Sequence, residues 1–179
     1  MMRTLWSGLL FLPLFGCAQH QPIRTEAQVD LERFMGDWYV IANIPTWLEE
    51  GAHNAVESYR LEDDGRVATR FRFRDGAFNG SEKIYNPVGF VQDDSNAVWG
   101  MQFVWPIRAE YRVVYVDPEY QRTIIGRSAR DYVWVMARKP ELEPEEYADL
   151  QRIVAEVGYD PARLRPVPQR WPEDASPER

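Results

Sequence analysis

Eight short strand-like segments follow one another between residues 36 and 138, and their regular spacing constrains the fold of this chain more than any other feature. The segment 67–74 is the clearest, because apolar residues and threonine alternate along it with arginine and alanine. Such alternation is typical of a strand with one face in a core and the other in water. The segments recur at roughly 8–12 residues with turn-type sequences between them, and they are 36–42, 55–61, 67–74, 82–91, 98–105, 111–116, 120–126 and 132–138.

An open sheet of eight strands would leave two exposed edges, and closing the sheet into a barrel removes both. A barrel of eight strands can also hold one small ligand. We therefore predict an all-β fold, an eight-stranded antiparallel up-and-down β-barrel. Pro87 falls inside the fourth segment, so we expect an edge, a bulge or a bend there.

The last strand is apolar on both faces, which requires a partner outside the barrel. The sequence after it has Pro144 where a helix would begin, Glu145 and Glu146 in the first turn, and Gly158 as a stop signal. Apolar residues between them recur at helical spacing. We therefore predict one C-terminal α-helix packed outside, with 164–167 as a candidate for a short edge strand.

Composition narrows the class of function. The chain of 179 residues fits one domain, and its formal net charge of −7 disfavours a nucleic-acid partner. A single cysteine excludes an internal disulfide, and two distant histidines match no metal or haem spacing, so no cofactor and no metal site are expected.

Residues 1–16 read as a signal peptide, because Arg3 precedes an apolar stretch too short to span a bilayer. Gly16 and Cys17 at its end resemble the lipobox of bacterial lipoproteins. The resemblance implies cleavage before Cys17 and acylation of Cys17, and Ala18 after it implies passage to the outer membrane. The alternative is an ordinary signal peptide with an incidental cysteine.

On this interpretation the mature chain has three further parts. Residues 17–29 form a lipidated N-terminus and flexible tether, residues 30–171 form the barrel domain, and residues 172–179 form a disordered tail. We expect the protein to be lipid-anchored at the bacterial outer membrane with its barrel on the periplasmic side. The choice between a monomer and a homodimer stays open.

Three separated motifs carry a resemblance to a known family. Gly36-x-Trp38 opens the first strand, Val116-Asp117-Pro118-Glu119-Tyr120 joins the sixth strand to the seventh, and Arg138 ends the eighth. In this order, with a helix after them, they resemble the conserved regions of the lipocalin family. The run D-Y-V-W-V-M-A-R at 131–138 is similar to bacterial lipocalins and their apolipoprotein D-like relatives. The resemblance covers about residues 30–171.

The family resemblance implies roles for these residues. Trp38 would close the barrel floor, Arg138 would pack across its ring, and Gly36 and Asp117 would support them structurally. Bacterial members bind fatty acids or lysophospholipids, so the expected function is storage or transport of such lipids at the membrane.

If the floor is at Trp38, loops 44–54, 75–79, 105–109 and 127–131 form the mouth. We expect the ligand to contact the inward-facing side chains of the strands, although the lower ones are expected simply to fill the core. The predicted inward side chains are Phe71, Phe73, Trp99, Met101, Phe103, Tyr111, Val113, Tyr115, Tyr132, Trp134 and Met136.

Charged residues leave two alternatives open. Glu57 pairs with Arg70 outside the barrel if Leu61 lies opposite Arg66, whereas a shift of one residue would bury an unpaired carboxylate; we expect the outside pairing. At the mouth, arginines could attract an anionic headgroup, or could belong to a mixed solvated rim with Glu49, Glu50, Glu110 and Asp131. These arginines are Arg74, Arg108, Arg127 and Arg130.

No catalytic residues are predicted. His53 is expected to be a loop residue, and no Ser–His–Asp order or carboxylate pair is evident. Two other functions compete with lipid binding. One is a structural or envelope-stress lipoprotein whose barrel is full, and the other is a lipocalin-type enzyme that would convert its bound lipid.

Overall fold

The structure is a computed structural model that describes residues 21–173. The predicted signal peptide at 1–16 and the predicted lipidation site Cys17 lie outside the described residues, as do residues 174–179 of the predicted tail. Within the described range, none of the helices has the length and apolar character needed to cross a bilayer.

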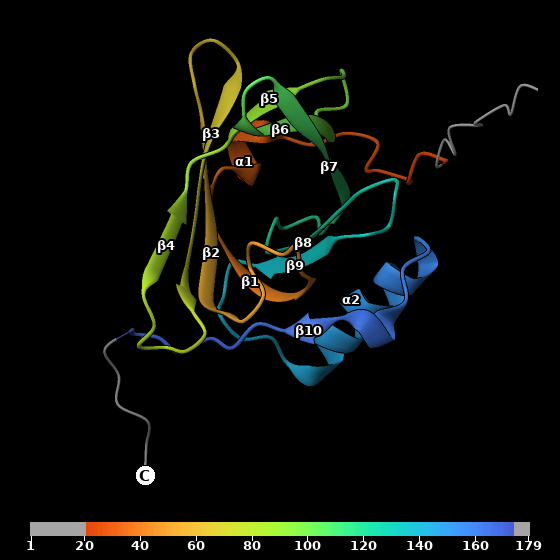
Figure 1. Ribbon diagram of the computed structural model, residues 1–179. Coiled ribbons are helices and arrows are strands. Elements are labelled where there is room, and N and C mark those ends of the chain that lie inside the picture. The colour runs from red at the N-terminus through yellow and green to blue at the C-terminus, as the bar shows by residue number, and fades with distance from the viewer. Residues whose placement is uncertain (1–20, 174–179) are drawn as a thin grey trace, which may run out of the picture.

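A closed antiparallel β-barrel forms the body of the protein, which confirms the predicted fold class (Figure 1). Neighbouring strands pair in the order β1-β2-β3-β5-β6-β7-β8-β9, and β9 returns to pair with β1 and closes the barrel. The strands are β1 (Gly36–Ile44), β2 (Ala52–Leu61), β3 (Arg66–Asp75), β4 (Glu82–Tyr85), β5 (Val88–Val91), β6 (Val98–Val104), β7 (Ile107–Val116), β8 (Arg122–Gly126) and β9 (Val133–Ala137).

The fourth strand of the barrel is broken in two, as Pro87 predicted. Both β4 and β5 pair with β3, but β5 alone continues the barrel to β6. Proline has no N–H to donate to a neighbouring strand, and here its carbonyl accepts a hydrogen bond of 3.1 Å from the Thr69 amide. Figure 1 shows β4 beside β3 and apart from β5 and β6.

The predicted outer helix is α2 (Pro144–Glu156), which covers β9. Leu150 and Val154 are buried against Val133 and Val135, so the second apolar face of β9 is removed from water. A 3₁₀ turn, η1 (Pro161–Arg163), follows.

After η1 the chain forms a short edge strand, β10 (Arg165–Pro166), within the predicted range 164–167. It pairs antiparallel with β1, where Ala42 lies opposite Pro166. The chain then crosses to β3, where Glu173 forms ion pairs with Arg72 and, at 2.8 Å, with Arg74. The described end of the predicted tail therefore contacts the barrel.

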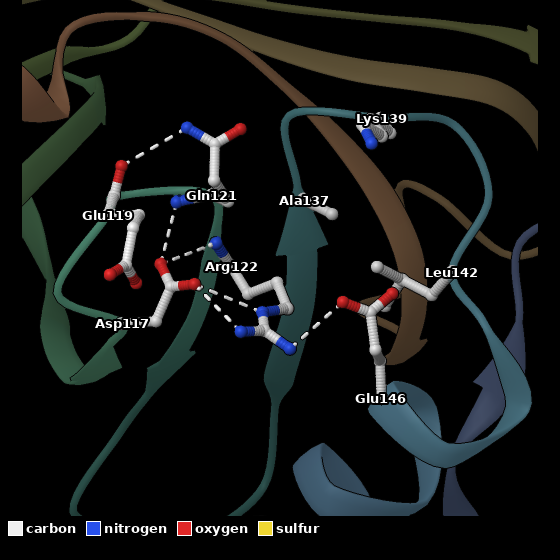
Figure 2. A pocket seen from close by; sticks show the side chains of 8 residues that line it. All are labelled: Asp117, Glu119, Gln121, Arg122, Ala137, Lys139, Leu142 and Glu146. Atoms are coloured by element: carbon white, nitrogen blue, oxygen red, sulfur yellow. Dashed lines mark hydrogen bonds and ion pairs between the residues drawn. The ribbon is translucent and has the colours of Figure 1, made fainter.

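The turn between β7 and β8 ties the barrel to the outer helix through Asp117 (Figure 2). Its carboxylate accepts hydrogen bonds from the backbone amides of Gln121 and Arg122, at 2.6 and 3.0 Å. The Arg122 guanidinium donates to the same carboxylate at 3.0 Å and to Glu146 of α2 at 3.1 Å. The Asp117 carboxylate thus organises this turn and links it to α2 through Arg122.

Residues 21–29 are packed against the barrel, which corrects the expectation of a flexible tether for this part of the chain. Ile23 and Val29 are buried, and the burial of each apolar side chain stabilises the folded state. Glu26 lies along β7, where its amide donates to the Val113 carbonyl and its carboxylate accepts from the Val116 amide, both at 3.0 Å.

The same segment enters from the open end of the barrel. The Arg130 guanidinium, in the loop between β8 and β9, donates to the Gln21 carbonyl at 2.8 Å. At the other end of the segment, the Val29 amide donates to the Ser95 carbonyl at 2.8 Å, in the turn before β6.

Candidate ligand-binding site

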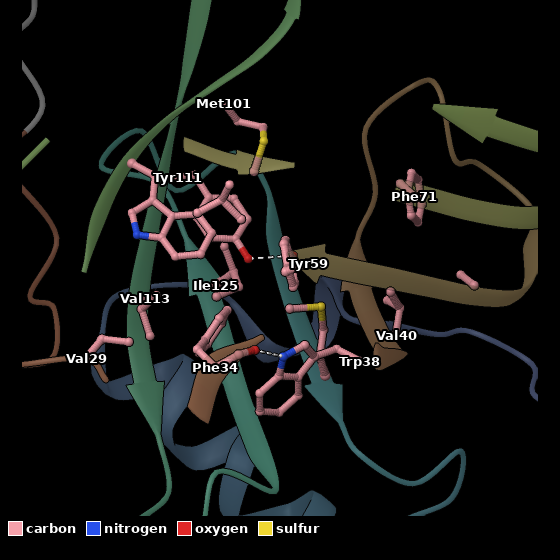
Figure 3. Packing of buried hydrophobic residues seen from close by; sticks show 14 of the residues in the cluster. Val29, Phe34, Trp38, Val40, Tyr59, Phe71, Met101, Tyr111, Val113 and Ile125 are labelled. Atoms are coloured by element: carbon pink, nitrogen blue, oxygen red, sulfur yellow. Dashed lines mark hydrogen bonds between the residues drawn. The ribbon is translucent and has the colours of Figure 1, made fainter. Parts of the chain in front are cut away.

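Trp38 closes one end of the barrel, as predicted. It is fully buried, its indole N–H donates to the Phe34 carbonyl at 2.8 Å, and its ring centre lies 5.2 Å from that of Phe34 (Figure 3). Phe34 comes from the short helix α1 (Leu31–Phe34), which the Asp30 side chain caps. The helix therefore supplies the second aromatic ring of the floor.

Arg138 covers the outer side of this floor. Its guanidinium carbon lies 3.8 Å from the centre of the Trp38 ring, which is the predicted cation–π contact. The guanidinium also donates to the carbonyls of Asp37 at 2.8 Å and Met35 at 2.7 Å. Gly36 has a φ of +93°, and a Cβ there would lie 3.3 Å from the Arg138 guanidinium, so the backbone conformation and the close approach both favour glycine.

Above this floor the barrel encloses a cavity of about 600 Å³ that opens at the other end. Most of its lining is apolar or aromatic, which is typical of sites for small hydrophobic ligands. Six of the predicted inward side chains line it, namely Phe71, Met101, Phe103, Tyr111, Tyr132 and Trp134.

Four other predicted side chains belong to the interior core and do not line the cavity. Trp99, Val113 and Met136 are fully buried in the same cluster as Trp38, and Phe73 packs against the ring of Phe71 at 5.2 Å. The expectation that part of the interior set fills the core is therefore correct.

Tyr115 does not face the interior, and the prediction for this residue is wrong. The register of β7 against β8 shifts between Val113 and Tyr115, which is the signature of a β-bulge. An extra residue reverses the alternation beyond it, so Tyr115 packs with Val114 in the outer cluster beneath α2.

Glu57 faces the cavity, which overturns the expected outside pairing with Arg70. Leu61 lies opposite Val67 instead of Arg66, and this shift of one position sets Glu57 opposite Phe71. A signal in the sequence could have revealed this, because Glu57 shares its face of β2 with aromatic Tyr59.

Two tyrosines hold the Glu57 carboxyl in place. The Tyr59 hydroxyl donates to Glu57 and lies 2.7 Å from the Tyr111 hydroxyl, with Tyr59 and Tyr111 drawn in Figure 3. Burial raises the pKa of Glu57 to about 7, against the opposing effect of the Tyr59 hydrogen bond and with a further rise from the charge of Glu49. Burial also raises the pKa of both tyrosines well above their usual value.

A second buried carboxylate, Glu49, fastens the loop between β1 and β2 across the cavity. Both of its oxygens accept from the Trp134 indole N–H at 3.1 Å, and one accepts from the Thr46 amide at 2.9 Å. Burial raises the pKa of Glu49 despite these hydrogen bonds. Glu49 was expected on a solvated rim, but 3% of its surface is exposed.

Arg127 is the one of the four predicted mouth arginines that lines the cavity. It forms an ion pair of 3.2 Å with Asp131, and its guanidinium carbon lies 5.2 Å from the centre of the Tyr132 ring. Its Nε is the only buried side-chain nitrogen or oxygen in residues 21–173 that has no hydrogen-bond partner. An anionic group at the mouth would supply that partner.

The other three arginines have different partners. Arg74 pairs with Glu173, Arg108 lies 3.6 Å from the centre of the Phe90 ring, and Arg130 donates to backbone carbonyls. They therefore belong to the scaffold or to the outer surface.

Large apolar side chains remain exposed around the mouth. Trp47 and Trp105 are 80% and 81% exposed. Together they form what we term the apolar rim, which consists of Trp47, Phe103, Val104, Trp105 and Ile107. All but Trp105 also line the cavity, so the rim and the cavity make one continuous apolar surface.

Comparison with known proteins agrees with this geometry. A family described as "Lipocalin-like domain" matches residues 29–169. Temperature-induced lipocalin-1 of Arabidopsis thaliana is 31% identical over 159 residues, which cover 84% of this chain and 83% of the plant protein. The outer membrane lipoprotein Blc of Escherichia coli (strain K12) is 26% identical over 146 residues, which cover 75% of this chain and 76% of Blc.

Solved structures give the same fold. Insecticyanin from Manduca sexta superimposes with a TM-score of 0.62 at 14% identity, over 84% of this chain and 85% of insecticyanin.

Proposed function

The chain belongs to the lipocalin-like family of small hydrophobic ligand-binding proteins, and from that membership we propose that its barrel binds a single-chain lipid, a fatty acid or a lysophospholipid. The observation that carries the proposal is the cavity of about 600 Å³, which is apolar along its walls and open at one end. Pockets of this volume bury most of the surface of a small lipid.

The headgroup of such a lipid would lie at the mouth. There the unpaired Nε of Arg127 offers a hydrogen bond to a carboxylate or a phosphate. The chain of the lipid would then extend along Tyr132, Phe71 and Met101 toward the closed end. Burial of apolar chain surface contributes roughly 25 cal/mol per Å² to the binding free energy.

We also propose that acylated Cys17 holds the protein at a bacterial outer membrane, where it stores or transports its lipid. The Blc relatives are named outer membrane lipoproteins, which supports this location. Gln21 lies at the open end of the barrel, and Cys17 precedes it by four residue steps, a reach of at most about 14 Å. Anchor and apolar rim would then meet the bilayer at the same end of the protein.

A substitution that fills the cavity tests the binding proposal. Ala109→Trp would place an indole among cavity-lining side chains, whereas Ala148→Trp would place one on the exposed face of α2. We expect the wild type and Ala148→Trp to bind a fluorescent fatty acid, and Ala109→Trp to lose at least roughly tenfold in affinity, or about 1.4 kcal/mol. Native mass spectrometry of protein extracted from membranes would identify the lipid.

Other results would favour the competing functions. A wild-type protein that carries no lipid on extraction and binds no fluorescent fatty acid would be the structural lipoprotein. Chemical change of the bound lipid over time, seen in the same mass spectra, would indicate an enzyme.

The anchor has its own test. Labelling of cells with a palmitate analogue should mark the wild type and leave Cys17→Ser unmarked. Equal labelling of both would exclude Cys17 as the site of acylation while leaving the binding proposal intact.

A further inference from the structure

The wall of the cavity carries an acidic side chain that a simple fatty acid cannot use. Glu57 lies deep in the barrel, opposite Phe71 on β3 and Trp38 on β1. A plain hydrocarbon chain bound alongside it would cover a polar oxygen without giving it a partner, which costs free energy. A carboxyl group at this position is favourable if the bound molecule carries a group that forms a hydrogen bond with it.

The two tyrosines leave one side of Glu57 available to a ligand. Tyr59 donates to Oε2, and Tyr111 in turn lies within hydrogen-bond distance of Tyr59. In residues 21–173 the hydrogen bond of Glu57 is with Tyr59, through Oε2; Oε1 has no partner but, unlike Arg127 Nε, is not fully enclosed by protein. Because Glu57 lines the cavity, Oε1 is the atom that remains for a bound molecule.

Resting on the proposed lipid-binding function, we propose that Glu57 binds a hydroxyl group on the buried part of the lipid chain, so that the preferred ligand is a hydroxylated single-chain lipid. The headgroup would stay at the mouth near Arg127. The hydroxyl would form its hydrogen bond with Glu57 where an unsubstituted chain would leave the carboxyl unpaired.

The charges around Glu57 favour a hydroxyl over a second acidic group. Glu49 already contributes negative charge near Glu57, and a buried carboxylate from the ligand would add to this repulsion. A hydroxyl is neutral, and it can both donate and accept. It therefore suits the carboxylate as well as the protonated carboxyl group.

The other polar side chain deep in the cavity does not compete for this role. Thr69 also lines the cavity, but its hydroxyl lies 3.5 Å from the Val67 carbonyl and 3.9 Å from the Met101 sulfur. Its hydrogen has partners within the protein. The Thr69 oxygen can still accept a hydrogen bond, but the unpaired carboxyl oxygen of Glu57 is the stronger acceptor and costs more to bury without a partner.

The depth of Glu57 sets where on the chain the hydroxyl must lie. Along β2, five residue steps lead from Ala52 near the mouth to Glu57, which is at most about 17 Å at roughly 3.3 Å per step, because barrel strands are tilted. The hydroxyl therefore belongs near the far end of a medium-length chain and well away from the headgroup.

Matched pairs of ligands isolate this contact. The probes are dodecanoate, tetradecanoate and hexadecanoate, each compared with its ω-hydroxy analogue by displacement of a fluorescent fatty acid. Both members of a pair carry the same carboxylate, so their difference reports the buried end. At the best chain length we expect the ω-hydroxy analogue to bind roughly tenfold more tightly than its parent.

Three variants assign the preference to Glu57. Glu57→Gln should keep it, because an amide also donates and accepts. Glu57→Leu should abolish or reverse it, because a hydroxyl would then be buried without a partner. Glu62→Gln removes an acidic side chain from the turn that follows β2 and should leave the preference as in the wild type.

The outcomes separate the two proposals. If each parent and its analogue bind equally to the wild type, or if Glu57→Leu keeps the preference, this inference is overturned and the lipid-binding function stands. If no probe binds the wild type, both fail. Infrared difference spectra of the wild type, which need no variant, should show the carboxyl band of Glu57 shifting with the hydroxy analogue alone, and an unchanged band would overturn the inference.

Discussion

The guanidinium carbon of Arg138 lies over the indole of Trp38, 3.8 Å from the ring centre, at the closed end of the barrel. Trp38 belongs to β1 and Arg138 directly follows β9, so this contact lies where β1 and β9 pair and close the barrel. The same guanidinium donates hydrogen bonds to backbone carbonyls in the connection between α1 and β1, including that of Met35. One side chain therefore connects Trp38 at the floor, the closing pair of strands β1 and β9, and the short helix α1.

Arg138→Met should consequently destabilise the fold by about 3 kcal/mol, because the cation–π contact is lost and several carbonyls lose their donor. Chemical denaturation would measure the change in the free energy of unfolding. Lys139→Met removes an exposed neighbouring charge and is the matched control. An Arg138→Lys variant as stable as the wild type would contradict the geometric argument, since lysine lacks the planar fork.

Asp117→Ala should cost roughly 2 kcal/mol, because a carboxylate that accepts two backbone amides and a guanidinium is removed from a buried turn. Thermal unfolding followed by circular dichroism is a suitable measurement. Glu119→Ala, at an exposed position of the same turn, should change the melting temperature little. Equal effects of the two substitutions would argue against a specific role for the Asp117 network.

Stability should depend on pH through Glu57. Its pKa is about 7 in the folded protein against an ordinary value of 4.5, so folding favours the protonated form. The stabilising effect is complete below pH 4.5 and is lost as the pH rises through about 7, a change of roughly 3 kcal/mol.

This dependence can be isolated by comparison with Glu57→Gln, which cannot ionise at this position. The variant should gain stability relative to the wild type as the pH rises from about 4.5 to about 7, and the difference should level off above that range. Urea denaturation across the range gives the difference, with Glu62→Gln as a control for the loss of one acidic side chain. A difference that stays constant with pH would refute the linkage.

The apolar rim should mediate contact with lipid surfaces. Replacing Trp47 and Trp105 by serine should weaken binding to phospholipid vesicles roughly tenfold, because two exposed indoles no longer leave water. A Cys17→Ser background separates this effect from the anchor, and vesicle sedimentation measures it. Ile84→Ser removes another exposed apolar side chain, on β4 and outside the rim, and should bind like its parent.

The barrel could be predicted because the alternation of apolar and polar residues shows which face of each strand meets water, and the turn signals show where each strand ends. Closure follows because an open sheet would leave two exposed edges. The floor could be predicted because Gly36-x-Trp38 and Arg138 resemble conserved regions of the lipocalin family, and the resemblance implies their contact without knowledge of register. The helix α2 could be predicted because β9 is apolar on both faces and requires a cover.

Features that depend on a shift of one residue were predicted wrongly, although Tyr59 on the same face of β2 was a signal for Glu57. The bulge in β7 turns Tyr115 outward, and the turn after β2 turns Glu57 inward, although neither changes the pattern of residue types. The packed segment 21–29 was missed because its two buried side chains, Ile23 and Val29, are too far apart to make a period.

The arrangement of strands around β1 also determines when the protein can fold. β1 is the first strand to be made, yet apart from β2 its partners are β9 and β10, and Tyr39 pairs with Ala137, roughly 100 residues later. The sheet cannot become a cylinder until nearly the whole chain is available. During synthesis the early strands thus remain without their closing partner until β9 has been made.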